Sequence, residues 1–164
     1  MTQPERLDSN DLQTYITANQ IPAEIVILDA PTPTVEAAAA VVGTAPRNIV
    51  KSILFLIDGE PTLALSTGDQ RVEYKALAVH FGISRKKVKL ATHAETLAIA
   101  GYEVGSVPPF GHRQPLPTLM DELVLELDWA YAGGGEQNAL VRLTPQTMQA
   151  FSGAQVVDLH TKPA

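Results

Sequence analysis

The 164-residue sequence contains no cysteine and no long apolar run. The absence of cysteine excludes disulfides, thiolate nucleophiles and cysteine-ligated zinc. No stretch approaches the roughly 18 apolar residues that a transmembrane helix requires, so we expect no membrane partner. The N-terminal residues also lack the basic-then-apolar pattern of a secretory signal. We therefore expect a single cytoplasmic domain over residues 1–164, with an N-terminal helix at 9–19 as an appendage.

The charge balance excludes another class of protein. Eighteen acidic residues outnumber twelve lysines and arginines, which gives a net charge of −6. Proteins that coat DNA or RNA broadly need a basic surface, so we expect no DNA partner. One local exception is a run of four cations in five residues. A solvated helix end or edge strand explains this run, and contact with a polyanion is the alternative. These residues are Arg85, Lys86, Lys87 and Lys89.

One lysine interrupts the most apolar run of the chain, residues 49–57. With the two-residue period of a strand, Lys51 shares a face with Ile53 and Phe55, whereas Ser52 points to the opposite face. Burying an unpaired ammonium group costs several kcal/mol. Three arrangements are therefore possible for Lys51. Its aliphatic chain extends so that the ammonium group reaches solvent, the ammonium group has an acidic partner, or it lies in a pocket that binds a negative or polarised group.

A glycine- and proline-rich segment, residues 101–117, predicts a long and stiff loop. Glycines let a backbone approach a ligand, while prolines fix its shape and leave some amides unpaired. Free amides in a fixed loop can hold an anion or a developing oxyanion. The spacing Gly-x-x-x-Pro occurs twice, at Gly105/Pro109 and at Gly111/Pro115, so spacing alone does not choose between them.

Other potentially reactive residues carry weaker signals. None of the four histidines has the spacing of a metal ligand, so we expect no metal site; His112 follows the stiff loop and could face a pocket. Because Ser52 points away from Lys51, a Ser–Lys nucleophile pair is not expected. The triple glycine at 133–135 lacks the Lys-Ser/Thr of a phosphate-binding loop and is typical of a simple turn.

Caps and turn residues divide the chain into short elements. Thr34 and Gly43 bracket one predicted helix, and Ser9 or Asn10 caps the first one. Because several strands are joined by short turns without strict alternation with helices, we expect an α+β fold with a mixed, curved sheet. The predicted helices span 11–18, 35–42, 72–81, 93–100 and 145–151, and the predicted strands span 24–28, 49–57, 63–67, 119–127, 139–143 and 155–159.

Four segments, at 34–52, 65–72, 101–111 and 143–158, occur in an order found in a known family. Together they resemble the YbaK/ProX family of aminoacyl-tRNA deacylases, free-standing homologues of the editing domain of prolyl-tRNA synthetases. The resemblance implies a barrel-like mixed sheet with flanking helices. It also implies a trans-editing hydrolase, which cleaves the ester between a wrong amino acid and the terminal adenosine of tRNA. Such a second, hydrolytic selection step is useful where a synthetase does not discriminate sufficiently between similar amino acids.

The resemblance also implies site residues and partners. The essential lysine of the family matches Lys51, its Gly-x-x-x-Pro loop matches Gly105 to Pro109, and its glycine-rich turn centres on Gly134. Hydrolysis is substrate-assisted in the family, and it requires no cofactor. The implied partners are the acceptor end of misacylated tRNA and an aminoacyl-tRNA synthetase such as prolyl-tRNA synthetase. The remaining expected substrate-binding residues are Ser52, Thr67, Gly68, Ser106, Val107, Pro108, Phe110, Gly111 and His112, with Arg85, Lys86, Lys87 and Lys89 as the tRNA contact.

Two alternatives use the same residues without hydrolysis. The first is a non-catalytic module that binds tRNA or a synthetase through the same pocket, and the second is a small-molecule-binding domain that rejects tRNA. Ser52 and the Ser106–Val107 pair do not distinguish alanine, cysteine, serine and threonine as the amino acid removed. The sequence leaves that specificity open.

Overall fold

The structure, a computed structural model, describes residues 5–164. Residues 1–4, part of the N-terminal stretch that lacks a signal pattern, lie outside this range. Within residues 5–164 the chain forms five α-helices, three short 3-10 helices and eight strands, and the strands form two sheets, which confirms the α+β prediction. The helices are α1 (Ser9–Ala18), α2 (Val35–Val42), α3 (Tyr74–Phe81), α4 (His93–Ala100) and α5 (Pro145–Ser152), and the 3-10 helices are η1 (Pro46–Asn48), η2 (Arg85–Lys87) and η3 (Glu122–Glu126).

The larger sheet is mixed and is built around a long hairpin. Its strand order is β4-β2-β3-β5-β8, with β2, β3 and β4 antiparallel and with β3, β5 and β8 parallel. The smaller antiparallel sheet has the order β1-β7-β6. The strands are β1 (Glu24–Ile27), β2 (Val50–Ile57), β3 (Glu60–Thr67), β4 (Val88–Leu90), β5 (Thr118–Asp121), β6 (Ala130–Gly133), β7 (Ala139–Leu143) and β8 (Gln155–Val157).

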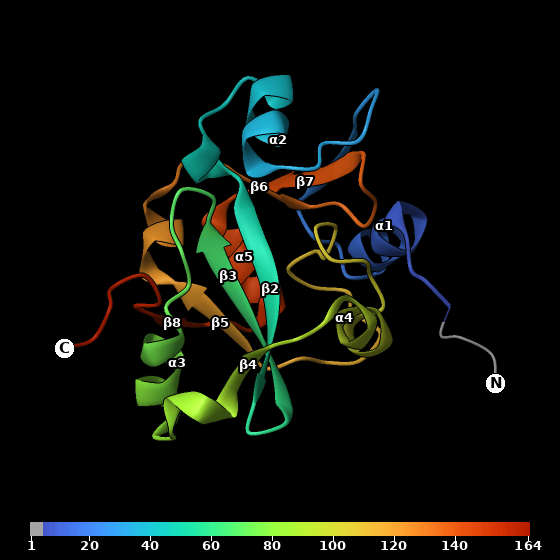
Figure 1. Ribbon diagram of the computed structural model, residues 1–164. Coiled ribbons are helices and arrows are strands. Elements are labelled where there is room, and N and C mark those ends of the chain that lie inside the picture. Colours follow the sequence, from blue (N-terminus) through green and yellow to red (C-terminus); the bar gives the residue numbers. More distant parts are fainter. Residues whose placement is uncertain (1–4) are drawn as a thin grey trace.

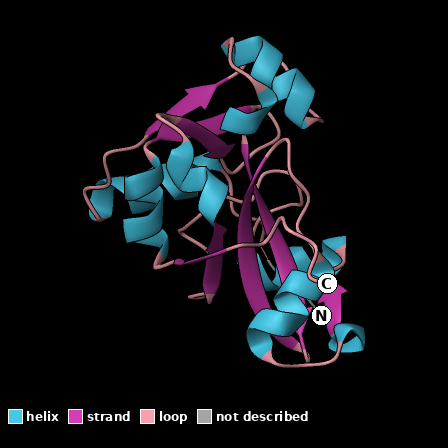
Figure 2. Ribbon diagram, turned by 90° about the vertical axis from the view of Figure 1, so that its left-hand side faces the viewer, coloured by secondary structure: helices cyan, strands magenta, loops and turns pink. Residues whose placement is uncertain are grey.

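Within residues 5–164, one isolated backbone bridge links the two sheets, just before the strand that carries the lysine. Ile49, just before β2, forms an isolated parallel bridge with Tyr131 in β6. In Figure 1 the β2–β3 hairpin runs through the centre, with α2 above it, α3 at its lower left and α4 and α1 to its right. The side view in Figure 2 shows that the helices lie around the strands and not between them.

The buried apolar residues of the part of the chain that the structure describes form three hydrophobic cores. Two of them lie on opposite faces of the β2–β3 hairpin, because successive side chains of a strand point to opposite faces. Val50 and Leu54 belong to the main core, whereas Phe55 and Ile57 belong to a second core on the other face of the hairpin. A third core lies under α2 and includes Ile49. Because opposite faces of β2 are both covered, the strand reads as a continuous apolar run and not as a simple alternation.

The N-terminal helix is part of the main core and not a loosely attached appendage. Leu12 and Ile16 are buried in that core. The helix begins with a capping box on Asp8, and not on Ser9 or Asn10 as predicted: the Asp8 side chain accepts from the amides of Asn10 and Asp11. Within residues 5–164, every helix is too short or too polar to cross a bilayer.

Two predictions of strand extent are wrong. The segment 119–127 is a strand only to Asp121, because the Asp121 carboxylate then accepts from the amide of Leu123 and caps η3. Gly133 is the last residue of β6 and not the first residue of a turn. β6 was not among the predicted strands, and for β4 the sequence was compatible with an edge strand or a helix end.

Candidate active site

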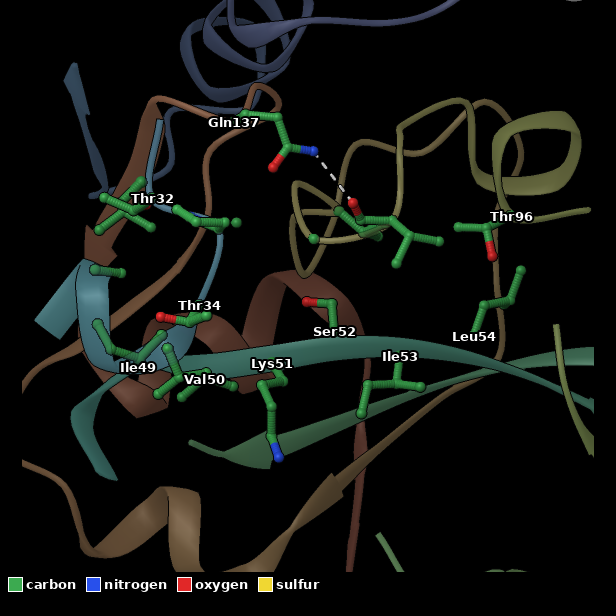
Figure 3. A pocket seen from close by; sticks show the side chains of 18 of the residues that line it. Thr32, Thr34, Ile49, Val50, Lys51, Ser52, Ile53, Leu54, Thr96 and Gln137 are labelled. Atoms are coloured by element: carbon green, nitrogen blue, oxygen red, sulfur yellow. Dashed lines mark hydrogen bonds between the residues drawn. The ribbon is translucent and has the colours of Figure 1, made fainter. Parts of the chain in front are cut away.

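A pocket of about 300 Å³ opens beside the first half of β2. One wall is the run Ile49–Leu54, a second is α4 with the residues before it, and a third is the loop at Val104–Val107 with the β6–β7 turn. Most of its lining is apolar. Its ionisable side chains are Lys51, His93 and Glu136, and its hydroxyl and amide groups come from Thr32, Thr34, Ser52, Thr96 and Gln137. Figure 3 shows this arrangement.

Lys51 and Ser52 leave β2 on opposite sides, as the alternation predicts (Figure 3). The Ser52 side chain points toward the loop that carries Gly105. The Lys51 side chain leaves on the other side, and its ammonium donates a hydrogen bond to the carbonyl of Gln70 at 2.5 Å. The Lys51 amine therefore does not point toward the Gly105–Pro109 loop, because β-strand geometry assigns the loop side of β2 to Ser52.

The electrostatics of Lys51 reflect its half-buried position. Desolvation lowers the pKa of its ammonium group, and the carboxylates of Asp69 and Glu36 partly oppose that effect. In the part of the chain that the structure describes, no carboxylate lies within ion-pair distance of Nζ, and Gln70 is the hydrogen-bond partner found. An ammonium group has three donors, so two remain for a ligand.

The loop from Gly101 to His112 divides between two hollows. Val104, Gly105 and Val107 line the pocket beside β2, whereas Pro109, Phe110, Gly111 and His112 line a second hollow together with Tyr15 of α1. The segment from Pro109 to His112 therefore does not line the pocket beside β2, and its contact with the substrate stays a prediction. Phe110 is buried in the main core and stacks on Tyr15 with ring centroids 6.0 Å apart, which turns this part of the loop away.

Hydrogen bonds hold the loop in one shape. Ser106 Oγ donates to the carbonyl of Glu103 at 2.9 Å, so this predicted substrate contact is a brace within the loop. His112 Nε2–H donates to the carbonyl of Pro108 at 2.7 Å. Burial lowers the pKa of His112, although the bond to Pro108 opposes this, which favours the neutral imidazole. Gln137 Nε2 donates to the carbonyl of Val104 at 3.2 Å and connects the loop to the β6–β7 turn (Figure 3).

Glycines allow two close approaches around the pocket. A Cβ on Gly133 would lie 2.3 Å from the carbonyl oxygen of Val107, so only glycine lets β6 reach the loop. A Cβ on Gly68 would lie 2.2 Å from the carbonyl oxygen of Pro46, which explains this predicted residue as a packing contact. Gly134 packs in the same way against the backbone of Ala139. The triple glycine therefore does more than make a simple turn.

Among the residues that the structure describes, two buried hydroxyl oxygens have no hydrogen-bond partner, namely Ser52 Oγ and Thr67 Oγ1. Thr67 pairs with Val50 in the hairpin and lies outside the pocket lining. Ser52 lines the pocket. Because no base is hydrogen-bonded to its Oγ, Ser52 lacks the partner that a serine nucleophile requires.

The run of cations occupies η2 and β4, close to the pocket wall. Arg85 stacks over the ring of Tyr74, with 4.3 Å from its guanidinium carbon to the ring centroid, and Lys87 Nζ lies 3.9 Å from Asp58. Lys86 and Lys89 are exposed. Leu90, the next residue, lines the pocket, so β4 connects the cations to it directly.

One cluster could hold a metal ion, but it lies outside the pocket. The Nδ1 atom of His160 lies 2.9 Å from a carboxylate oxygen of buried Asp121 and 3.1 Å from Asp158. Asp121 also accepts from the amides of Leu123 and Leu159, so its carboxylate is already satisfied within the protein. This histidine is a packed residue of the C-terminal segment.

Sequence reasoning missed several residues of the pocket. Thr34 was identified only as a helix cap, which it is, since its Oγ1 accepts from the amide of Ala37. Thr96 and Gln137 carried no motif, because the tertiary structure alone brings α4 and the β6–β7 turn to β2. The sequence also does not predict that the edge of β2 beside the pocket lacks a strand partner, because this depends on where β4 ends.

Comparisons with known proteins agree with this architecture. Residues 29–151 match the sequence profile of the family described as the aminoacyl-tRNA editing domain. The chain is 26% identical over 146 residues to the uncharacterised protein YwhH of Bacillus subtilis (strain 168), covering 88% of this chain and 91% of that one. It is 28% identical over 125 residues to a proline–tRNA ligase of Streptococcus equi subsp. equi (strain 4047), covering 74% of this chain but 20% of the ligase.

A solved structure gives the same result. The crystal structure of a candidate trans-editing enzyme for prolyl tRNA synthetase superimposes with a TM-score of 0.87 and 33% sequence identity. The alignment covers 94% of this chain and 97% of that protein. The protein described here belongs to the aminoacyl-tRNA editing domain family.

Proposed function

We propose that this protein is a trans-editing hydrolase that deacylates misacylated tRNA at the ester bond to the terminal adenosine. The observation that carries the proposal is the pocket in which the edge of β2 at Ser52 faces the braced loop at Gly105–Val107. Both walls present backbone groups, which suit a polar ester whose carbonyl oxygen gains charge during hydrolysis. Family membership supports the same substrate class.

Hydrolysis in this pocket relies on positioning. Ser52 lacks a hydrogen-bonded base, and the ionisable side chains in the lining are Lys51, His93 and Glu136. We infer that backbone groups hold the ester and a water, and that the ribose hydroxyl next to the ester helps to activate that water. Holding reactants in the correct geometry supplies a large part of the rate enhancement.

Lys51 serves the nucleotide end of the substrate in this proposal. Its amine lies on the face of β2 away from the Gly105 loop, beside the Gln70 carbonyl, and it retains two free donors. This position supports contact with the terminal phosphate region more than contact with the scissile carbonyl. A positive charge there fixes the acceptor end while the ester lies in the pocket.

The run of cations, Arg85 to Lys89, extends this surface toward the tRNA acceptor stem. Lys86 in η2 and Lys89 in β4 are exposed, and Leu90, the residue after Lys89, lines the pocket. Partners are then the acceptor end of misacylated tRNA and a synthetase such as prolyl-tRNA synthetase, and the site of action is the cytoplasm, where translation occurs.

The direct test is deacylation of tRNAs charged with alanine, cysteine, serine, threonine or proline, measured with EDTA present. We expect turnover of at least one mischarged tRNA, and Lys51→Ala should lower its rate at least about a hundredfold. Lys75→Ala, which removes an exposed lysine on α3, is the matched control and should retain activity. Wild-type activity in Lys51→Ala would contradict the assigned role, and tRNA binding without turnover of any ester would instead indicate a binding module.

A further inference from the structure

The edge of β2 beside the pocket has no strand partner. On this side β4 pairs only with Phe55–Ile57, and the amide of Ala91 donates to the carbonyl of Leu54 at 3.0 Å. At the other end, Ile49 bridges to Tyr131. Between these points, no strand within residues 5–164 pairs with this edge at residues 51–53. This explains why consecutive residues of β2, and not alternate ones, line the pocket.

The ladder identifies which backbone groups point out of this edge. The amide of Asp58 donates to the carbonyl of Lys87, and the amide of Ala91 donates to the carbonyl of Leu54. In an antiparallel ladder the residues that bond to one neighbour alternate along the strand. The backbone N–H and C=O groups of the even-numbered residues of β2 therefore point toward the edge where β4 pairs. At Ser52, beyond the end of β4, both groups point into the pocket.

Ser52 combines this open backbone with an unsatisfied side chain. Its Oγ is buried without a hydrogen-bond partner, although the residue as a whole remains partly exposed. A buried hydroxyl without a partner is unfavourable in the free protein, and no hydrogen bond fixes its rotamer. A rotation about one bond lets it follow a ligand that offers a partner.

We propose that the aminoacyl group of the substrate pairs with β2 at Ser52 as a one-residue antiparallel strand, and that Ser52 selects acyl groups with a side-chain hydroxyl, namely seryl and threonyl. This inference rests on the proposed function. The α-ammonium donates to the carbonyl of Ser52, and the ester carbonyl accepts from its amide, which are the two bonds that a hydrogen-bonded pair exchanges. The amide also polarises the ester carbonyl for attack by water.

The pairing decides where the acyl side chain lies. Residues directly opposite in an antiparallel pair project to the same face, with Cα atoms about 5.5 Å apart. The acyl side chain then lies beside Ser52 Oγ, among Val50, Leu54 and Thr96 of the pocket lining. Hydroxyl pairs at such positions form cross-strand hydrogen bonds. An alanyl group would leave the Ser52 hydroxyl without a partner.

The test compares seryl and alanyl esters on the same tRNA. Wild type should deacylate the seryl form about tenfold faster, and Ser52→Ala should remove that preference by slowing the seryl reaction about tenfold more than the alanyl reaction. Ser52→Thr, which retains a hydroxyl, should keep the preference. Ser66→Ala makes the same chemical change on the neighbouring strand and the opposite face, and should leave the preference unchanged.

A binding measurement separates recognition from turnover. Stable amide analogues, 3′-serylamino- and 3′-alanylamino-adenosine, should compete with substrate, with the seryl compound binding about tenfold more tightly to wild type and equally to Ser52→Ala. Faster alanyl than seryl turnover, or an equal loss on both esters in Ser52→Ala, would overturn this inference while the proposed function stands. No turnover of any aminoacyl-tRNA would instead overturn the proposed function, and the inference with it.

Discussion

The Nζ atom of Lys51 lies 2.5 Å from the carbonyl oxygen of Gln70, on the side of β2 opposite the Ser52 hydroxyl. One strand thus presents a cation to one side and an open backbone edge with a hydroxyl to the other. The two neighbouring residues can therefore contact different parts of one substrate. This relationship supports the proposed contact of Lys51 with the nucleotide end of the substrate over a role at the scissile carbonyl.

The pH dependence of deacylation should report the charge on Lys51. Desolvation lowers its pKa, and Asp69 opposes that effect. Replacing Asp69 with Asn removes an interaction that favours the charged form, so the pKa falls further and the protonated fraction declines at a lower pH. We expect the alkaline decline of kcat/KM, measured between about pH 7 and 10 and corrected for spontaneous hydrolysis, to begin at lower pH in Asp69→Asn.

Asp128→Asn provides the control, because Asp128 is exposed and is not among the groups that shift the pKa of Lys51. Its profile should match wild type. An alkaline decline that moves to higher pH in Asp69→Asn, or that moves equally in both variants, would show that Lys51 does not control it.

Gly133→Ala should disturb the loop at Val107. The added Cβ would lie 2.3 Å from the carbonyl oxygen of Val107, so β6 and the loop must separate. Overpacking of this kind costs about 1–3 kcal/mol of stability. We expect a lower denaturant midpoint together with a fall in kcat/KM for deacylation, because the loop is a wall of the pocket.

Gly43→Ala separates the two effects. Gly43 ends α2 with φ of 73°, and a Cβ there meets nothing within 4 Å, so only backbone strain of about 1–2 kcal/mol is introduced. Its stability should fall while its kcat/KM stays near wild type. If Gly133→Ala lost stability and kept full activity, the loop position would not matter for catalysis.

The run of cations should contribute to tRNA binding but not to ester chemistry. We expect the double variant Lys86→Glu/Lys89→Glu to bind tRNA more weakly. The salt slope, which is the slope of log K for binding against the logarithm of the salt concentration, should fall in magnitude by about 1 for each phosphate that a lysine no longer neutralises. Hydrolysis of a minimal aminoacyl-adenosine should remain unchanged, since that substrate does not extend along β4. Filter binding at several salt concentrations measures the first effect, and steady-state kinetics measure the second.

A single reversal elsewhere, Lys162→Glu in the exposed C-terminal segment, is the control for a charge change away from this surface, with half the change in net charge of the double variant. It should leave the salt slope unchanged. Equal losses on tRNA and on the minimal substrate in the double variant would refute the assignment of this surface to tRNA.

Local chemistry was readable from the sequence. Thr34 and Gly43 bracket α2 as predicted, Thr92 and Glu95 form a capping box at the start of α4, and the turn at Asp58–Gly59 closes the hairpin. These features depend on residues within a few positions of one another, so a linear pattern suffices. The opposite orientation of Lys51 and Ser52 follows from the same local geometry.

The tertiary structure decided which of these residues face the pocket. The place where β4 stops leaves the edge of β2 open, and the anchoring of Phe110 against Tyr15 turns half of the glycine–proline loop away. Both depend on contacts between segments far apart in the chain. The sequence by itself therefore determined the five helices, the caps of α2 and the alternation along β2, because these are local. Only long-range packing decided which strand edge stays unpaired, and hence where a substrate can bind.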